Sequence, residues 1–166
     1  PGHDMEALGY YNPEKRVLIS GDALWENGFG VIFPELLGEA DGLAWTRLTL
    51  DMLARLPIDI VIPGHGSPFT TVDAAFERAF RRLEMFTAGI DKLAWHAIKV
   101  IVSFAMLERR QLPVADFPAF VLSLPFAVDV NARYLNLTDD QLIERIQREL
   151  LLVNALKREG ALIKAG

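Results

Sequence analysis

The chain has 166 residues, of which 51% are hydrophobic, so it can bury a core and is not a disordered segment. It has no cysteine, which excludes disulfide scaffolds, iron–sulfur clusters, cysteine zinc ligands and thiol nucleophiles. The net charge is −5, and residues 1–70 hold ten acidic residues against four basic ones. This balance argues against a general nucleic-acid surface and suits a bound cation.

The sequence begins with Pro, and its first Met is residue 5, so we expect a domain or fragment of a longer protein. No signal peptide is visible at the start, and no apolar run reaches the length of a membrane span. We therefore expect no membrane partner and a cytoplasmic location.

A β-hairpin is predicted at the start of the chain. Short strands are expected over 6–11 and 16–20, with a turn at Asn12-Pro13-Glu14-Lys15 between them. The apolar run Val17-Leu18-Ile19 is typical of a strand that is buried on both faces. Residues 25–42 hold four glycines and a proline, which predicts a loop with one helical turn.

Two helices and a strand are predicted next. Asp41 is a candidate N-cap for a helix that ends near Arg55. The apolar side chains of this helix fall on one face, opposite a charged face, and they are Trp45, Leu48, Met52, Leu53 and Leu56. A strand is predicted over 58–62, and the second helix over 72–86 is expected to be capped by Thr70 or Thr71.

The character of the sequence changes after Gly89. A long, very apolar helix is predicted over 91–110, followed by short pieces that three prolines separate, namely Pro113, Pro118 and Pro125. We place a domain boundary here, with a first domain over 1–88 and a second over 90–166.

The last predicted helix covers 139–159, with Thr138 as its N-cap. Gly160 is expected to end this helix, and residues 161–163 to form a short strand. The second domain is therefore predicted to be mostly α-helical.

The chain has three histidines, His3, His65 and His96, and the first two each end a Pro-Gly-His tripeptide. Pro and Gly favour a tight turn from which the imidazole projects. Asp22 likewise follows a predicted strand. If the strands are neighbours, His3, Asp22 and His65 meet at one edge of a sheet, and imidazole and carboxylate ligands suit zinc, iron or manganese.

Three motifs in this order resemble the second half of the metallo-β-lactamase superfamily: Pro-Gly-His at 1–3, Leu-Ile-Ser-Gly-Asp-Ala-Leu at 18–24 and Ile-Val-Ile-Pro-Gly-His-Gly at 60–66. The resemblance covers residues 1 to about 88. It implies an α+β fold that is part of an αββα sandwich. It also implies a hydrolase that uses metal-bound hydroxide on a small-molecule ester or thioester, with a phosphodiester as the alternative.

The resemblance assigns a role to each candidate ligand. His3 would complete the ligand set of a first zinc ion, Asp22 would bridge two zinc ions, and His65 would be the last ligand of the second. Iron and manganese are alternative metals, and no catalytic residue separate from the ligands is implied. The His-x-His-x-Asp-His motif of the family's first half is not found in this sequence. We therefore expect an incomplete metal site and no turnover by this chain alone.

Residues 90–166 resemble the winged-helix-like extension that some members of the superfamily carry. The last predicted helix alternates acidic and basic residues, which is typical of a solvated face, so we expect no DNA partner. A non-catalytic module for dimerisation or partner binding is the alternative function. Because half of a sandwich leaves a sheet face uncovered, and because mean hydropathy is +0.21, we also expect a homo-oligomer or self-association.

Four further side chains have more than one interpretation. Trp25 and Phe29 follow Asp22 and suit either a substrate pocket or the core, with equal weight. Asp4 follows a candidate ligand, and a solvated charge is favoured over a role in supporting that ligand. His96 lies in a predicted helix and is interpreted as structural.

Overall fold

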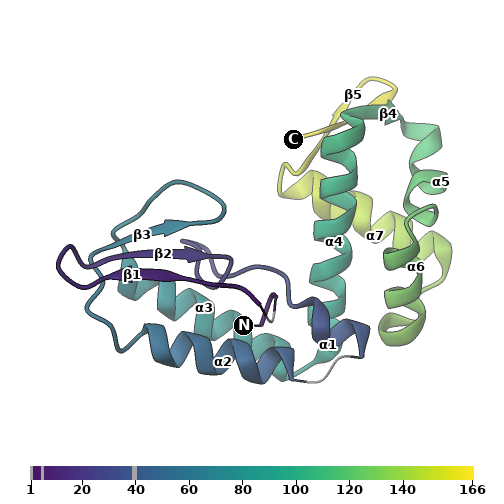
Figure 1. The fold of residues 1–166 in the computed structure, drawn as a ribbon. Helices are drawn as coiled ribbons and strands as arrows, with labels where there is room; N and C mark the ends of the chain where they lie inside the picture. The colour runs from purple at the N-terminus through teal and green to yellow at the C-terminus, as the bar shows by residue number, and fades with distance from the viewer. Residues whose placement is uncertain (1, 5, 39–40) are drawn as a thin grey trace. The chain divides into compact units, whose positions relative to one another are not determined.

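The computed structural model describes residues 2–4, 6–38 and 41–166, and Figure 1 shows its fold. Pro1, the first residue of the first Pro-Gly-His motif, lies outside the described residues. The chain divides into two compact units, Pro1–Ile90 and Asp91–Gly166. Within the described ranges each unit contains helices and one three-stranded sheet, so the fold is of the mixed α+β class.

The first unit places a sheet over two helices (Figure 1). Its elements are β1 (Tyr10–Asn12), β2 (Val17–Gly21), α1 (Phe33–Leu37), α2 (Gly42–Leu53), β3 (Ile60–Pro63) and α3 (Val72–Thr87). β1 pairs antiparallel with β2, and β2 pairs parallel with β3. The predicted hairpin is confirmed with a shorter first strand, and the predicted loop holds one short helix, α1.

One face of this sheet is buried and the other is open. Leu18, Ser20 and Val61 are buried, whereas Ile19 is 47% exposed. The prediction that this strand is buried on both faces is therefore wrong. Pairing places Tyr10 beside Ile19 and Ile19 beside Ile62. We call the exposed apolar surface the open sheet face, and it consists of Tyr10, Ile19, Ile60 and Ile62.

Helix α2 buries a different face from the one its sequence predicts. The exposed side chains include Trp45, Leu48 and Met52, whereas the buried ones are Thr46, Thr49, Leu50 and Leu53. The hydroxyl of Thr46 donates to the carbonyl of Gly42 at 2.8 Å, so it is satisfied within the helix and can be buried at little cost. Apolar periodicity does not detect this use of threonine. The predicted apolar face is therefore wrong at Trp45, Leu48 and Met52, whereas Leu53 is buried as predicted.

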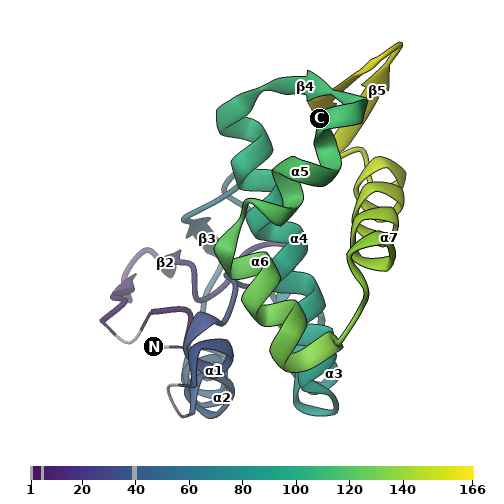
Figure 2. The ribbon, with the colours of Figure 1, turned by 90° about the vertical axis from the view of Figure 1, so that its right-hand side faces the viewer.

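The second unit consists of helices and a small sheet (Figure 2). The helices are α4 (Ile90–Arg109), α5 (Phe117–Leu122), α6 (Pro125–Val130) and α7 (Asp139–Leu152), with a 3-10 turn at Val114–Asp116 and a π-helical turn at Asn131–Leu135. The strands are β4 (Gln111–Pro113), β5 (Leu156–Glu159) and β6 (Leu162–Ala165), in the order β4-β6-β5. The long helix and the proline-separated pieces are confirmed, whereas the winged-helix-like character stays a prediction.

The last helix is shorter than predicted. α7 ends at Leu152, and Asn154 has a left-handed φ of 57° that a helix cannot continue through. The next residues form β5, which pairs with β6 across a turn at Gly160, where φ is 59°. The helix predicted over 153–159 is therefore wrong, and Gly160 serves a hairpin instead of a helix end.

The N-cap prediction is confirmed with its hydrogen bond at α7. At α2 and α3 the predicted residue holds the N-cap position, but the capping hydrogen bond is not formed. The hydroxyl of Thr138 accepts from the N–H of Gln141, and the side chain of Gln141 accepts from the N–H of Thr138, which is a capping box. Asp41 and Thr71 occupy the N-cap positions of α2 and α3, but neither makes a side-chain capping bond.

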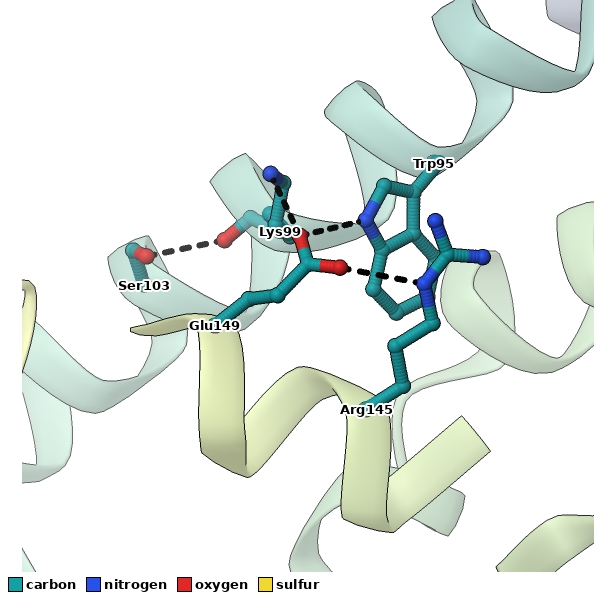
Figure 3. A network of polar contacts seen from close by, with 5 residues as sticks. All are labelled: Trp95, Lys99, Ser103, Arg145 and Glu149. Atoms are coloured by element: carbon teal, nitrogen blue, oxygen red, sulfur yellow. Dashed lines mark hydrogen bonds and ion pairs between the residues drawn. The ribbon is translucent and has the colours of Figure 1, made fainter. Parts of the chain in front are cut away.

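A polar network joins α4 to α7 within the second unit (Figure 3). The carboxylate of Glu149 accepts from Trp95 at 2.8 Å, from Lys99 at 2.9 Å and from Arg145 at 3.0 Å. The Arg145 guanidinium also lies 4.0 Å from the centre of the Trp95 ring. Burial alone would raise the pKa of Glu149, but these hydrogen bonds and the charge of Lys99 outweigh it and lower the pKa to about 2.

Among the described residues, no single helix is long and apolar enough to span a membrane. A bent pair, Val114–Leu122 and Pro125–Leu135, meets the same requirement by length and composition, with 70° between its two parts.

Candidate metal site at the ends of two parallel strands

Two neighbouring strands carry Asp22 and His65 to the same edge of the first sheet. β2 and β3 are parallel, and Gly21 at the end of β2 pairs with Pro63 at the end of β3. The register shifts between Ile19 and Gly21, and such bulges re-aim the side chains that follow them. Asp22 and His65 therefore both leave the carboxyl ends of parallel strands, where α/β proteins commonly bind ligands.

His3 completes this cluster. Its Nε2 lies 3.3 Å from Oδ2 of Asp22, and Nε2 of His65 lies 3.7 Å from Oδ1 of the same carboxylate. Each carboxylate oxygen thus faces a different imidazole. The side chains of His3 and Asp22 are partly buried, whereas that of His65 is 58% exposed. The structure brings together all three side chains that the sequence singled out.

The hydrogen bonding of His3 leaves a lone pair directed at Asp22. Nδ1 of His3 lies 2.5 Å from the carbonyl oxygen of Val31. A carbonyl can only accept, so Nδ1 carries the proton, and in the neutral ring Nε2 is an acceptor. The facing Asp22 oxygen is also an acceptor, so both atoms are of the type that ligates a metal ion. Histidines that bind a metal commonly donate a hydrogen bond from the other ring nitrogen to a backbone carbonyl.

Two glycines allow the backbone to pass close to the cluster. A Cβ at Gly30 would lie 2.9 Å from both the His3 ring and Cβ of Asp22. A Cβ at Gly64 would lie 2.7 Å from Oδ1 of Asp22. The same glycines fix the backbone around the cluster, because their N–H groups donate to the carbonyls of Asp22 and Gly21, both at 2.8 Å. A side chain at either glycine would displace the carboxylate.

The structure separates the roles of Trp25 and Phe29. Phe29 is almost fully buried, packs edge-on against Phe86, and lines a cavity of about 10 Å³ beside His3 and Asp22. It is therefore a core residue. Trp25 is partly buried, and its Nε1 donates to Oδ1 of Asp22 at 3.0 Å. Sequence reasoning missed this bond, for which the only signal was the position of Trp25 three residues after Asp22.

The donor types fit a divalent cation, although the cluster is not a preformed metal site. Two imidazoles and a carboxylate are a common ligand set for zinc, iron and manganese. Within residues 2–4, 6–38 and 41–166, however, no three acidic or histidine side chains are arranged so that they could hold a metal ion as they stand. The predicted site residues therefore supply suitable chemistry without a complete coordination shell.

The two other titratable residues that the sequence singled out are Asp4 and His96. Asp4 is exposed, and its carboxylate accepts from the backbone N–H of Glu6 at 2.9 Å, as a turn residue does. His96 is partly buried in α4 of the second unit.

The segment that carries the cluster is similar to known proteins. Residues 1–65 match the model of the Metallo-beta-lactamase superfamily. A hydroxyacylglutathione hydrolase of Bartonella tribocorum is 38% identical to this chain over 77 residues. Those residues are 46% of this chain and 27% of that protein, so the match spans about a quarter of the relative's length. These matches confirm the predicted resemblance of residues 1–65 to the metallo-β-lactamase superfamily.

Two solved structures are also similar. A metallo-beta-lactamase family protein of Thermus thermophilus aligns over the whole of this chain and over 47% of its own length. The TM-score is 0.41 and the sequence identity is 19%. A beta-lactamase domain protein of Burkholderia ambifaria aligns with 99% of this chain and 44% of its own, at a TM-score of 0.38 and 22% identity. This chain thus spans under half of the length of both.

Proposed function

We propose that this chain is part of a metal-dependent hydrolase and that His3, Asp22 and His65 are ligands in its metal site. The observation that carries the proposal is the position of one carboxylate between two imidazole Nε2 atoms at 3.3 and 3.7 Å. The match of residues 1–65 to the model of the metallo-β-lactamase superfamily supports it. Zinc is the favoured metal, with iron and manganese as alternatives.

The geometry of Asp22 suits a bridging ligand. Oδ2 faces His3 and Oδ1 faces His65, so Asp22 would hold two cations together with these two histidines. An anion between two cations offsets their mutual repulsion. When bound, the metal ions supply Lewis-acid activation of water and of the substrate oxygen. The residues of this chain contribute by holding the cations in place, with the carbonyl of Val31 fixing the ring of His3.

An ester or thioester is the substrate class that we favour. The relative from Bartonella tribocorum is named as a hydrolase of a hydroxyacylglutathione, and an acylglutathione is a thioester. A phosphodiester is the second substrate class, because the same Lewis-acid chemistry acts on phosphoryl oxygen.

The site of this chain by itself is incomplete, so we propose that it binds metal weakly and does not turn over substrate. Calorimetric titration with zinc tests this directly. We expect a weak binding isotherm that Asp22→Asn weakens further, and no hydrolysis of a thioester. Tight stoichiometric zinc binding by this chain would contradict the proposed incompleteness, and an unchanged isotherm for Asp22→Asn would contradict the ligand assignment.

A non-catalytic module for dimerisation or partner binding is the second candidate function. The observation that favours it is the open sheet face, where Ile19 is 47% and Tyr10 64% exposed. The sequence upstream in the gene separates the two candidates. A His-x-His-x-Asp-His motif there supports the hydrolase, because it would supply the remaining ligands, and its absence supports the module.

No DNA partner is proposed for the second unit. The exposed face of α7 carries Glu144 4.0 Å from Arg148, and Arg145 is engaged by Glu149. Paired charges of both signs do not make the basic stripe that a DNA phosphate backbone requires.

A further inference from the structure

We infer that Trp25 is a positioning residue that sets the orientation of the Asp22 carboxylate and the His65 ring in the proposed metal site. The inference rests on the proposed function, because it concerns the same ligands. Its basis is a double contact: Nε1 of Trp25 donates to Oδ1 of Asp22 at 3.0 Å, and its ring meets the His65 ring edge-on at 5.1 Å and 73°.

The hydrogen bond restricts the Asp22 carboxylate. Oδ1 accepts from the Trp25 N–H and is also the oxygen that faces His65. An indole N–H can only donate, so it fixes which way Oδ1 points and thereby turns Oδ2 toward His3. An ionised carboxylate oxygen has a second lone pair, so Oδ1 remains able to bind a cation while it accepts this bond.

The ring contact restricts His65. Its side chain is 58% exposed and follows a strand end, so the ring would be free to rotate without a neighbour. The edge-on packing against Trp25 is an arrangement that aromatic pairs favour. One indole thus orders two of the three proposed ligands, which lowers the entropy lost when a metal binds.

The indole is itself held by a tight turn. The backbone N–H of Trp25 donates to the carbonyl of Gly28 at 2.7 Å, and the N–H of Gly28 donates back at 3.3 Å. Helix α3 supports this turn from one side. Arg78 Nε donates to the carbonyl of Glu26 at 2.7 Å, and the Thr71 hydroxyl donates to the Glu26 side chain at 3.3 Å.

A second arginine of α3 packs on the same turn. The Arg82 guanidinium occupies the place that a side chain at position 28 would need, because a Cβ on Gly28 would lie 2.5 Å from its Nη1. It also lies 5.9 Å from the centre of the Phe29 ring, and burial lowers the pKa of Arg82. The turn therefore rests on a rigid helix, and Trp25 is presented to the ligands in a fixed position.

The first test measures the hydrogen bond without any metal. In proton–nitrogen NMR spectra of the chain, the indole N–H signal of Trp25 is expected to shift when Asp22→Asn removes the charge of the acceptor. The signal of Trp45, an exposed tryptophan of α2, serves as the control and is expected to stay in place. A Trp25 signal that does not move would overturn the inference.

The second test measures the affinity of the chain for manganese by the proton relaxation of water. Trp25→Phe is compared with Trp45→Phe, and circular dichroism verifies that the two variants are folded to the same extent. Loss of a group that supports a metal ligand typically costs roughly 10- to 100-fold in affinity, so we expect Trp25→Phe to bind roughly tenfold more weakly and Trp45→Phe to match the wild type. A structural role alone would change stability and leave the affinity of the folded protein unchanged.

Further variants make the outcomes distinguishable. If Trp25→Phe does not fold, Arg78→Gln decides, because it removes a support of the turn and keeps the indole, and we expect a several-fold weaker affinity. The role of Trp25 is overturned if the variant that decides, Trp25→Phe or in its place Arg78→Gln, binds manganese as tightly as the wild type. If Asp22→Asn also leaves the affinity unchanged, the proposed metal site fails as well, whereas a loss in Asp22→Asn alone refutes only the role of Trp25.

Discussion

The candidate site depends on the Asp22 side chain, whose carboxylate oxygens lie 3.3 Å from Nε2 of His3 and 3.7 Å from Nε2 of His65. Asp22 and His65 were foreseeable as neighbours, because each lies three positions after the end of an apolar run and parallel pairing of the two runs brings their ends together. The supports of the ligands were not foreseeable in this way. Trp25 reaches Asp22 through a turn, and Val31 reaches His3 across 28 positions, so neither contact leaves a periodic signal in the sequence.

The Glu149 network in the second unit gives a prediction on stability. Glu149→Gln removes the charge that Lys99 and Arg145 face, and hydrogen bonds to charged groups contribute about 1.5–3 kcal/mol each. Because the Glu149 side chain is 27% exposed, we expect the lower end, a loss of roughly 1–2 kcal/mol in the free energy of unfolding. Urea denaturation followed by circular dichroism measures it.

Glu144→Gln is the matched control for this prediction. Glu144 lies on the same helix, but its side chain is 80% exposed and 4.0 Å from Arg148. Such surface pairs contribute little, so we expect no measurable change. Equal effects of the two substitutions would contradict the structural role of the network.

The same carboxylate predicts a dependence of stability on pH. The pKa of Glu149 is lowered from 4.5 to about 2 by its hydrogen bonds and by Lys99, which outweigh the effect of burial. A lowered pKa in the folded state stabilises the protein above pH 4.5, and this contribution is lost as the pH falls toward 2. The difference in melting temperature between the wild type and Glu149→Gln should therefore shrink over that range. A difference that stays constant from about pH 5 to about pH 2 would refute the assignment.

Among the helices and strands, the predictions made from the sequence are correct where local signals determine the structure. They are wrong where tertiary contacts determine it. The capping box at Thr138 is local and was foreseeable. The buried face of α2 depends on a threonine that satisfies its own hydroxyl, and the end of α7 depends on one left-handed asparagine and on strand pairing between β5 and β6. Apolar periodicity contains none of this information.

The capping box predicts a measurable contribution of Thr138. Thr138→Ala removes the acceptor of the Gln141 N–H, and the loss of such a cap costs about 1 kcal/mol. Thermal and urea unfolding measure the change. Thr71→Ala is the comparison, because Thr71 holds the N-cap position of α3 without a capping bond, and we expect a clearly smaller effect there. A larger loss at Thr71 than at Thr138 would be inconsistent with this interpretation of the two caps.

At the scale of the whole molecule, the open sheet face predicts self-association of this chain. Ile19 and Ile62 lie side by side on exposed, paired strands, and burying such a surface against a second copy is favourable. Sedimentation velocity should show association at high concentration that Ile19→Lys and Ile62→Lys abolish. Leu152→Lys is the control, because Leu152 is 80% exposed in the second unit, and it should associate like the wild type. A monomeric wild type at high concentration would count against the prediction.

The account depends most on the claim that His3, Asp22 and His65 bind one metal site together. Paramagnetic line broadening by manganese in NMR spectra of the labelled chain tests this claim directly. We expect the strongest broadening around residues 2–3, 22–23 and 64–66 at the same low metal concentration, and its loss at all three places in Asp22→Asn. Broadening that is strongest at another acidic segment, or that persists in Asp22→Asn, would contradict the claim.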